Sequence, residues 1–504
     1  MLNVSTPALD QSAQQALALF QAGRAREAGD LFLQILQACP THLRALRGFA
    51  NCAAAIGNHT LAAEVAQAAL AIEPQDVGTM LVLGHALILM ANATEAIAVH
   101  ERAIAVAPRS AAAQMGLGLA QLLAAQAPEA QAAFLRARDL LPGDPFIAAS
   151  HLYGLHYLAD KTPREIFEAH RAWGAAIAPP VQHHANERDA ERRLRVGYVS
   201  ADFRNHAVSR FIEPLLAAHD PAQVETFCYF NHRHHDAVTA RLQKLAGHWR
   251  EILDLSDEAA AALIREDRID LLVDLNGHTA NDRLLLFAKK PAPIQLTYLG
   301  YPDTTGLPAM DYRLTDGVAD PPGAEVLHTE ELVRLPAPFV CFGLPENLPP
   351  VGPPPAVASG YITFGSFNTL VKLTPPHIAT WAALLRGVAG SRLLLKSAAL
   401  GDAGVQRRIR EQFAAGGVGG DRLEFVGHLP NNTEHLAMYH RVDIALDTFP
   451  YNGTTTTCEA LAMGVPVVTR AGGMHASRVG ATLLSAVGRE AWIAQDEAGF
   501  VEIA

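Results

Sequence analysis

The sequence predicts an α-helical repeat array followed by two α/β lobes of the doubly wound type. Prolines and alanines recur every 34 residues in the first third of the chain. After Arg193, short β-branched or apolar runs alternate with helical stretches, which favours parallel sheets. With 504 residues the chain is too long for one ordinary domain, so we expect several cores.

The composition is that of a globular chain with no general affinity for nucleic acids. Half of the residues are hydrophobic and 18% are charged, which excludes a disordered chain. The net charge of −11 argues against non-specific nucleic-acid binding, which requires a basic surface. Any phosphate site must therefore be local.

The cysteines and the N-terminus predict a cytoplasmic protein. The five cysteines are scattered and show no C-x-x-C spacing, as expected of reduced thiols: Cys39, Cys52, Cys228, Cys341 and Cys458. The N-terminus lacks a basic segment followed by an apolar one, and the longest apolar run is interrupted by Gly84 and His85. We therefore expect no secretion signal and no membrane segment.

The 34-residue period resembles that of the tetratricopeptide repeat, a helix–turn–helix unit of this length. About four repeats are expected over residues 9–144. The recurring residues are Pro40, Pro74, Pro108 and Pro142, together with Ala28, Ala62, Ala96 and Ala130. Small residues suit close helix crossings, and proline suits the end of a helix. We expect a groove that recruits protein substrates; the alternatives are a spacer or a homodimer contact.

Residues 145–192 predict a helical extension and a linker. The helical pattern continues from Phe146 to about Ile177, so we expect it to extend the array, and Pro179 and Pro180 end it. The mixed charges between Asn186 and Arg193 predict a solvated linker.

Two Rossmann-like lobes are predicted over residues 193–347 and 358–504, separated by the proline-rich stretch Pro345 to Pro355. In such folds the ligand lies at the carboxyl ends of the strands. Neither a G-x-G-x-x-G nor a G-x-x-x-x-G-K-[ST] motif is present, which disfavours dinucleotide redox chemistry and NTP hydrolysis. The expected strands are 195–200, 226–230, 269–275, 294–299, 361–367, 392–396, 423–426, 444–446 and 465–468.

The stretch from Asp443 to Thr469 reads as strand, turn, helix and strand. Gly453 and the threonines that follow it stand at the expected helix start. Unpaired N–H groups and the positive end of the helix dipole suit a diphosphate at that place. The alternative is that Thr454 to Thr457 only cap the helix.

Together with four other stretches, this segment resembles glycosyltransferase family 41, the nucleocytoplasmic protein O-glycosyltransferases. The matching motifs are Asn205-His206, Gly300-Tyr-Pro302, Phe367-Asn368 with Lys372, Asn452-Gly453 before threonines, and Ala476-Ser-Arg478. The resemblance covers residue 9 to the end and implies tetratricopeptide repeats joined to a two-lobed GT-B catalytic region. Thr454 and Glu459 resemble the SPINDLY branch, whereas O-GlcNAc transferases have histidine and aspartate there.

The resemblance implies an inverting glycosyltransferase that moves one sugar to Ser or Thr of a target protein. The donor it implies is UDP-GlcNAc or GDP-fucose. The family's asparagine ladder in the repeats is not kept, because Asn51 is followed one period later by His85 and then by Leu119. Family members continue beyond the position of Ala504, so we expect a chain that is incomplete at its C-terminus.

Two residues are expected to carry the chemistry. Lys372 would stabilise the negative charge that grows on the departing diphosphate. His206 would accept the proton of the attacking hydroxyl or orient the sugar; the alternative is a structural histidine. Further residues expected to bind the donor are Gly300, Tyr301, Pro302, Asn368, Thr369, His435, Gly453, Thr454, Thr455, Thr456 and Glu459. His278 is a weaker candidate for a place in the cleft.

No metal and no other cofactor are expected. The chain has no D-x-D motif, so Lys372 and backbone amides would replace a metal clamp. The adjacent His234 and His235 look metal-like, but adjacent loop histidines are more often solvated. Alternative functions are a repeat adaptor with an inactive nucleotide-binding region, and transfer to asparagine or to a small glycan.

Overall fold

The computed structural model describes residues 6–177, 184–189, 191–336, 338–345 and 347–504. The chain divides into two compact units. The first comprises residues 1–147 with 397–411 and 425–428, and the second comprises residues 148–396, 412–424 and 429–504. Each unit is described by itself.

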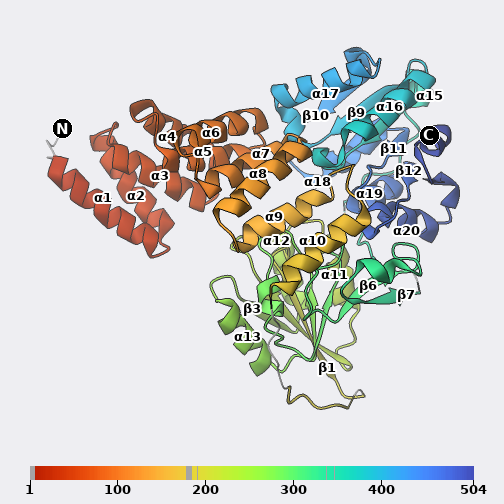
Figure 1. Cartoon of the computed structure of the whole chain (residues 1–504), viewed down its shortest axis with the longest axis horizontal. Coiled ribbons are helices and arrows are strands. Elements are labelled where there is room, and N and C mark those ends of the chain that lie inside the picture. Colours follow the sequence, from red (N-terminus) through yellow and green to blue (C-terminus); the bar gives the residue numbers. More distant parts are fainter. Residues whose placement is uncertain (1–5, 178–183, 190, 337, 346) are drawn as a thin grey trace. The chain divides into compact units, whose positions relative to one another are not determined.

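The first unit contains the predicted repeats as four consecutive helix pairs, in which each helix packs on the next (Figure 1). The prediction of a helical repeat array at the N-terminus is confirmed. The helices are α1 (Thr6–Gln21), α2 (Ala25–Ala38), α3 (Leu43–Ala55), α4 (His59–Ile72), α5 (Val77–Leu89), α6 (Ala93–Val106), α7 (Ala111–Leu123) and α8 (Ala127–Leu140).

The repeat period follows from helix caps and from close helix contacts. His42, Asp76 and Ser110, spaced by 34 residues, each accept a hydrogen bond from the third N–H of the helix that follows. The phenyl ring of Phe134 packs so closely on Gly118 that a Cβ there would overlap it. Asp402, from the second α/β lobe in sequence, also belongs to this unit and accepts hydrogen bonds of 2.7 Å from the N–H and hydroxyl of Thr94.

The helical extension consists of α9 (Pro145–Leu155) and α10 (Pro163–Ala175). The expectation that it continues the repeat array is wrong, because residues from Ala148 onward belong to the second unit. His156 and His170 hydrogen bond the Tyr301 hydroxyl of the first lobe, at 3.2 and 2.7 Å. The extension is thus part of the α/β unit.

The first lobe contains a seven-stranded sheet of order β3-β2-β1-β4-β5-β6-β7, in which each strand pairs in parallel with its neighbours. Its strands are β1 (Leu194–Ser200), β2 (Val224–Phe230), β3 (His248–Glu251), β4 (Leu271–Asp274), β5 (Ile294–Thr297), β6 (Tyr312–Asp316) and β7 (Glu331–Leu335). Its helices are α11 (Ser209–Ala218), α12 (Ala237–Leu245), α13 (Asp257–Glu266), α14 (Leu284–Phe287) and the 3-10 helix η1 (Ala324–Leu327).

The second lobe contains a six-stranded sheet of order β10-β9-β8-β11-β12-β13. The strands are β8 (Thr363–Ser366), β9 (Arg392–Lys396), β10 (Leu423–Val426), β11 (Ile444–Leu446), β12 (Val467–Arg470) and β13 (Ile493–Ala494). The α-helices are α15 (Ala356–Ser359), α16 (Pro375–Gly387), α17 (Ala403–Ala415), α18 (Asn432–Ala437), α19 (Thr455–Ala462), α20 (Val479–Ala486) and α21 (Glu497–Ile503). The 3-10 helices are η2 (Leu370–Lys372), η3 (Ala398–Gly401), η4 (Gly420–Arg422), η5 (Met438–Arg441), η6 (His475–Ser477) and η7 (Glu490–Trp492).

The prediction of two doubly wound lobes is confirmed, with differences at some strands. β3, β6, β7 and β13 were not predicted, and β12 begins two residues after the expected start at Val465. Within the proline-rich stretch Pro345 to Pro355, the described residues form neither helix nor strand, as expected of a connection.

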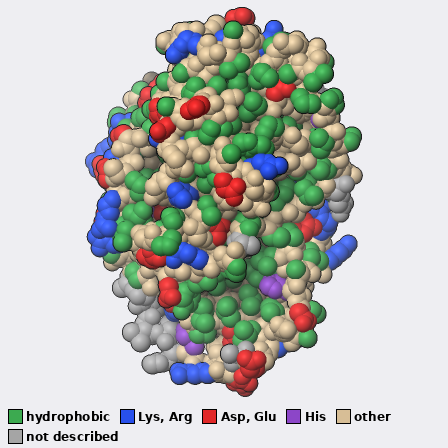
Figure 2. Space-filling view, turned by 90° about the vertical axis from the view of Figure 1, so that its right-hand side faces the viewer, with side chains coloured by type: hydrophobic (Ala, Val, Ile, Leu, Met, Phe, Trp, Pro, Cys, Tyr) green, Lys and Arg blue, Asp and Glu red, His purple; other side chains and the backbone are tan. Residues whose placement is uncertain are grey.

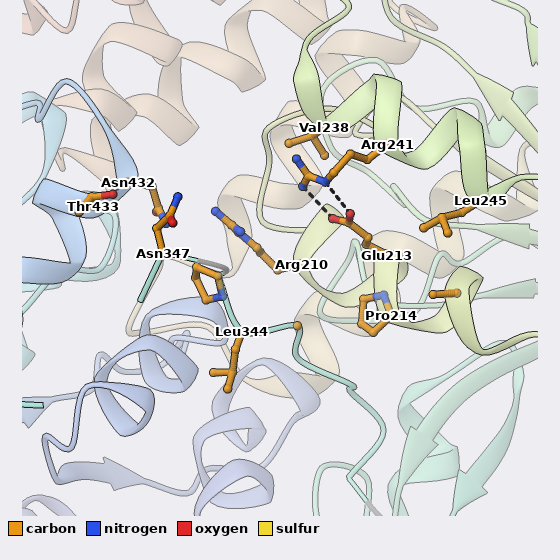
Figure 3. A pocket seen from close by; sticks show the side chains of 13 residues that line it. Arg210, Glu213, Pro214, Val238, Arg241, Leu245, Leu344, Asn347, Asn432 and Thr433 are labelled. Atoms are coloured by element: carbon orange, nitrogen blue, oxygen red, sulfur yellow. Dashed lines mark hydrogen bonds and ion pairs between the residues drawn. The ribbon is translucent and has the colours of Figure 1, made fainter. Parts of the chain in front are cut away.

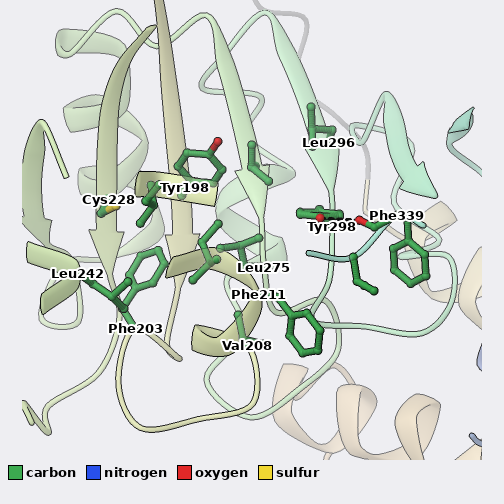
Figure 4. Close-up of a cluster of buried hydrophobic side chains, with 14 of the residues drawn as sticks. Tyr198, Phe203, Val208, Phe211, Cys228, Leu242, Leu275, Leu296, Tyr298 and Phe339 are labelled. Atoms are coloured by element: carbon green, nitrogen blue, oxygen red, sulfur yellow. Dashed lines mark hydrogen bonds between the residues drawn. The ribbon is translucent and has the colours of Figure 1, made fainter. Parts of the chain in front are cut away.

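A hydrophobic core lies under the first sheet and continues into the second lobe (Figure 4). Tyr198, Phe203 and Phe211 of the first lobe belong to it, as do Val479 and Leu483 of α20. The Tyr298 hydroxyl within this core donates a 2.6 Å hydrogen bond to the carbonyl of Phe339.

Polar contacts also join the two lobes at the turn after β6. His475 lies with its Nδ1 2.7 Å from Asp320, and Thr482 donates to Asp316 at 2.8 Å. Arg478 donates through Nε to the carbonyl of Val318 at 2.8 Å. The side chains of Asp316, Asp320, His475 and Thr482 are all buried. These contacts therefore fix the lobes against each other.

Acidic and basic side chains are interspersed over the face shown in Figure 2, where neither sign forms a continuous patch. None of the described helices combines the length and apolar character needed to cross a membrane.

The contact between Gly118 and Phe134 allows a test of the repeat packing. We expect Gly118→Ala to lower the free energy of unfolding by about 1–3 kcal/mol, because the added methyl group overpacks the helix crossing. The matched control is Gly78→Ala in α5, where the added Cβ meets only Asp76 at 3.8 Å. That change should be neutral or stabilise by up to about 1 kcal/mol. Urea unfolding followed by far-UV circular dichroism measures both; equal effects would contradict the packing argument.

Candidate active site

The predicted site residues stand directly after the carboxyl ends of strands. His206 follows β1, His278 follows β4, and Gly300 to Pro302 follow β5. In the second lobe, Asn368 to Lys372 follow β8 and Asp447 to Thr454 follow β11. This is the edge at which doubly wound sheets bind ligands.

Lys372 and Asp447 form the electrostatic centre of the second lobe's edge. The Lys372 ammonium donates a 2.8 Å hydrogen bond to the carbonyl of Asn452 and lies 3.8 Å from the centre of the Tyr451 ring. Burial lowers the pKa of Lys372 to about 8, against the opposing attraction of Asp447. Burial likewise raises the pKa of Asp447 to about 6, although its hydrogen bonds and Lys372 favour the charged form. Both groups therefore titrate near neutral pH.

The Asp447 carboxylate organises the turn that leads to α19. It accepts hydrogen bonds from the N–H groups of Gly453 and Thr448, at 2.6 and 2.8 Å, and from the Thr469 hydroxyl at 2.6 Å. Gly453 has no room for a side chain, because a Cβ would overlap the Thr456 hydroxyl and come within 2.8 Å of Asn368. The turn thus requires glycine and brings the start of α19 close to Asn368.

The threonines of α19 do more than cap the helix. Thr454 occupies the N-cap position but makes no side-chain cap hydrogen bond, so the simple capping alternative does not describe it. The Thr456 hydroxyl donates to Asn368 at 2.9 Å, and that of Thr457 donates to the carbonyl of Gly453 at 3.0 Å. Thr454, Thr455 and Thr456 are partly exposed. The first-turn N–H groups have no acceptor within the helix, an arrangement that suits an anion.

Lys396, His435 and Glu459 form a hydrogen-bonded row beside this turn. The Lys396 ammonium donates to His435 Nδ1 at 3.0 Å, and His435 Nε2 lies 2.9 Å from Glu459. Because the lysine can only donate, Nε2 carries the imidazole proton and donates it to the carboxylate. Burial lowers the pKa of Lys396, while Glu459 opposes this effect.

His206 lies in the loop before α11, partly exposed, with Nδ1 3.5 Å from the Asp202 carboxylate. Asp202 also accepts a 2.9 Å hydrogen bond from Asn276, which ties the loop after β1 to the loop after β4. Burial lowers the pKa of His206, and Asp202 opposes this shift. A largely neutral imidazole beside a carboxylate at a strand end has the properties of a proton acceptor.

Tyr301 and His278 are not placed as predicted. The Tyr301 side chain is 1% exposed and its hydroxyl lies between His156 and His170, so it has no surface for a donor. His278 is also 1% exposed, its Nε2 lies 2.7 Å from the carbonyl of Thr305, and burial lowers its pKa well below the usual value. The prediction of a cleft position for His278 is wrong: it belongs to a buried cluster that attaches α10 to the lobe.

The neighbours of Tyr301 have structural reasons for their identity. Gly300 approaches the carbonyl of Leu275 so closely that a Cβ would overlap it, and Pro302 is buried. Arg313, fully buried, donates to the carbonyls of Tyr301 and Asp303, at 3.0 and at 2.6 Å. Thr369, by contrast, is exposed before η2.

A cavity of about 530 Å³ lies between the first-lobe helices α11 and α12 and the first turn of α18 (Figure 3). Arg241 and Glu213 form a two-point ion pair on its wall, at 2.7 and 3.0 Å. Arg210 extends toward Asn347 in the view of Figure 3. Asn432 lies on the opposite wall, three residues before His435 on α18. Lys396, His435 and Glu459 themselves do not line the cavity.

Within the described residues, no three His, Cys, Asp or Glu side chains are grouped so that they could hold a metal ion. His235 lies 3.5 Å from Glu251 and is exposed, as expected of a solvated loop residue.

Sequence reasoning missed the roles of Asp202, Lys396 and Asp447. Asp202 stands four residues before His206, a spacing that pairs a carboxylate with a histidine. Lys396 is the last residue of β9, at the same sheet edge as the other site residues. Asp447 directly follows β11 within the stretch that indicated the anion site. Position after a strand end is the signal that could have found all three.

Comparisons with known proteins agree with this geometry. The chain is 42% identical to the Petunia hybrida protein named "Probable UDP-N-acetylglucosamine--peptide N-acetylglucosaminyltransferase SPINDLY", over 70% of this chain and 39% of that protein. The Arabidopsis thaliana protein of the same name is 41% identical over 70% of this chain and 40% of its own length. The chain thus spans about two fifths of the length of these curated relatives.

A solved structure resembles nearly the whole chain. It is a mutant of the O-GlcNAc transferase of Thermobaculum terrenum, with a TM-score of 0.87 and 35% identity, covering 92% of this chain and 88% of that one. The sequence model of "Glycosyl transferase family 41" matches residues 174–343 and 356–504, which include both lobes. The chain, a tetratricopeptide-repeat array with a GT-B region, is therefore a member of glycosyltransferase family 41.

Proposed function

We propose that the protein is an inverting protein O-glycosyltransferase. A Ser or Thr hydroxyl oxygen of a target protein attacks the anomeric carbon of a nucleotide-linked sugar and forms the new C–O bond. The bond to the diphosphate breaks, and the nucleotide diphosphate leaves with the electron pair. One observation carries this proposal: the half-buried Lys372 lies beside the turn that begins α19, at the carboxyl edge of the sheet. Lys372 bonds to the carbonyl of Asn452, and Asp447 accepts from the N–H of Gly453 in the same turn.

Lys372 and the start of α19 stabilise the leaving diphosphate. Negative charge grows on that group as the bond breaks, so a cation and N–H groups beside it bind the transition state more tightly than the ground state. Lys372 donates to the carbonyl of Asn452. That carbonyl holds the ammonium next to the turn, so little rearrangement is required when the diphosphate arrives.

His206 accepts the proton of the acceptor hydroxyl. In the structure Nδ1 accepts a 3.3 Å hydrogen bond from the N–H of Val208 and lies 3.5 Å from Asp202. For Nε2 to act as the acceptor, the proton of the neutral ring must sit on Nδ1 and face Asp202, which then stabilises the cation that forms. The carboxylate orients the ring and does not itself take the proton.

The Lys396–His435–Glu459 row holds the nucleoside end of the donor. It lies on the second lobe beside the diphosphate turn, and the cavity lined by Arg210 and Asn432 gives the base room to extend. Protein targets are recruited through the repeats.

Two donors are candidates for different reasons. UDP-GlcNAc is the donor in the names of the curated relatives, and the similar solved structure is that of an O-GlcNAc transferase. Thr454 and Glu459 resemble the SPINDLY branch, and this resemblance favours GDP-fucose. Both residues lie where the donor is proposed to bind: Thr454 in the diphosphate turn and Glu459 in the row with His435. Isothermal titration calorimetry with each donor decides between them. Failure of both to bind would overturn the proposal, and binding of a donor without labelling of protein targets in a lysate would indicate an adaptor.

The two site lysines provide a matched pair of variants. Lys372→Met should lower kcat by about 100-fold or more, as expected when one preorganised donor to a developing charge is lost. Lys396→Met should mainly raise the KM for the donor, because Lys396 acts through His435 on nucleotide binding. Steady-state kinetics of sugar transfer separates the two effects, and circular dichroism checks the fold. Equal loss of kcat in both variants would contradict the division of roles.

The pH dependence follows from Lys372 and Asp447. Lys372 is active as a cation, so kcat/KM should fall as pH rises through about 8. Asp447 is active as a carboxylate and His206 as a neutral imidazole, so kcat/KM should fall as pH decreases through about 6, with both groups contributing to the acid limb. In Lys372→Arg any remaining activity should lose the alkaline limb, because arginine stays charged. An unchanged alkaline limb in that variant would assign the limb to another group.

The proposed stabilisation of the leaving group involves no metal ion. We expect the rate of transfer to stay within about twofold when EDTA is added, because the Lys372 cation and amides supply the charge that a metal would otherwise supply. The measurement is transfer to a protein target with and without chelator, followed by added Mg²⁺ or Mn²⁺. A large loss that either ion restores would contradict this expectation.

A further inference from the structure

A second cavity, of about 320 Å³, lies entirely within the repeat unit. Its walls come from α5, α6 and α7, from the end of α8 and from the segment that begins α9. They are almost wholly apolar, with Leu81, Ile88, Met115, Leu119 and Phe146 among the lining side chains. Phe146 and Leu141 stand at its rim, 47% and 49% exposed. None of the residues assigned to sugar transfer lines it.

One polar side chain on this wall has no partner within the described chain. His100 is 2% exposed, and neither of its ring nitrogens makes a hydrogen bond. Burial, together with the nearby His85, lowers the pKa of His100 to about 4, so the ring is neutral at pH 7. A neutral imidazole has one donor and one acceptor, and leaving such groups buried and unpaired is unfavourable.

The repeat period shows that packing alone does not require histidine at this position. Position 100 is equivalent to positions 32, 66 and 134, spaced by 34 residues, which carry Phe, Ala and Phe. Phe32 and Phe134 are fully buried against glycines, as His100 is against Gly84 and Gly116. Phenylalanine therefore fills the same place elsewhere in the array. What histidine adds is two ring nitrogens beside an apolar cavity.

We propose that this cavity binds a tyrosine side chain of a target protein, with the phenol hydroxyl hydrogen bonded to His100. The cavity is large enough for one aromatic ring, and Met115 and Phe146 offer favourable contacts to its faces and edges. A phenol hydroxyl both donates and accepts, so it can pair with either nitrogen of the neutral ring; an indole N–H only donates. The proposal rests on the proposed recruitment of targets by the repeats.

The binding test uses two small probes and the full chain. p-Cresol represents the tyrosine side chain, and toluene is the same ring without the hydroxyl. Ligand-observed NMR titration should show p-cresol binding on the order of fivefold to tenfold more tightly than toluene, as expected for one hydrogen bond. Equal affinities, or no binding of either probe, would overturn the proposal.

The control variant is His100→Phe, which copies Phe32 and Phe134. It should abolish the preference for p-cresol while the circular dichroism spectrum is retained. If that variant does not fold, His100→Ala, which copies Ala66, should give the same loss of preference. A preference that persists in the folded variant would place the hydroxyl elsewhere and overturn the proposal.

Two further measurements distinguish this proposal from other outcomes. In the wild-type protein, saturating p-cresol should raise the KM for a protein target and leave kcat unchanged. If no transfer occurs with any donor, the probe titration still tests the cavity, so the two failures can be told apart. If p-cresol instead dissociates a dimer in sedimentation velocity, the occupant is a second copy of the chain and the proposal fails.

Discussion

The site depends on the burial of one carboxylate, that of Asp447. Removed from water, it satisfies its oxygens with the N–H groups of Gly453 and Thr448 and the hydroxyl of Thr469. These bonds fix the turn between β11 and α19, and the same negative charge favours the cationic form of Lys372. Asparagine, the neutral residue of the same shape, could still accept from both N–H groups through its amide oxygen, but it would leave the lysine without its counter-charge. One side chain thus sets both the geometry and the electrostatics of the edge.

A separate set of contacts fixes the first lobe against the second. Asp316 and Asp320, after β6, receive Thr482 and His475 from the second lobe, and the shared apolar core adds Val479 and Leu483. Moving one lobe away would leave these buried carboxylates without partners, which is costly, so the contacts favour one arrangement of the two lobes. The acidic turn after β6 therefore acts on catalysis by positioning, although none of its residues need touch the donor.

Much of this fold could be predicted because its signals are local. The 34-residue period arises because each repeat needs its own helix cap, such as Asp76, and its own close helix crossing, such as that of Gly118 on Phe134. Strands with strongly apolar runs, such as β9, were placed to the residue. β3 was missed because its sequence, His-Trp-Arg-Glu, is polar and only partly buried, so no apolar run indicates it. Lys372 and Gly453 were singled out from motifs, and the structure places both beside Asn452, at one strand edge.

Partners across the chain could not be predicted from periodicity. The helical pattern of α10 is visible in the sequence, but nothing local reveals that His170 pairs with Tyr301, 131 residues later. The sequence likewise cannot distinguish a histidine in a cleft from one in a core, so His278 and His206 looked alike.

Hydrogen-bond satisfaction separates the structural histidines from those open to a ligand. His170 is buried, and both of its ring nitrogens have partners, the carbonyl of Ile166 and the hydroxyl of Tyr301, so the fold itself explains a histidine at this position. His100 is equally buried, yet both of its nitrogens are orphaned beside an open cavity. Since a phenylalanine fits the equivalent place twice in the same array, the unpaired polarity is not needed for folding. The unfavourable burial of those nitrogens is relieved only if something outside the described chain bonds to them.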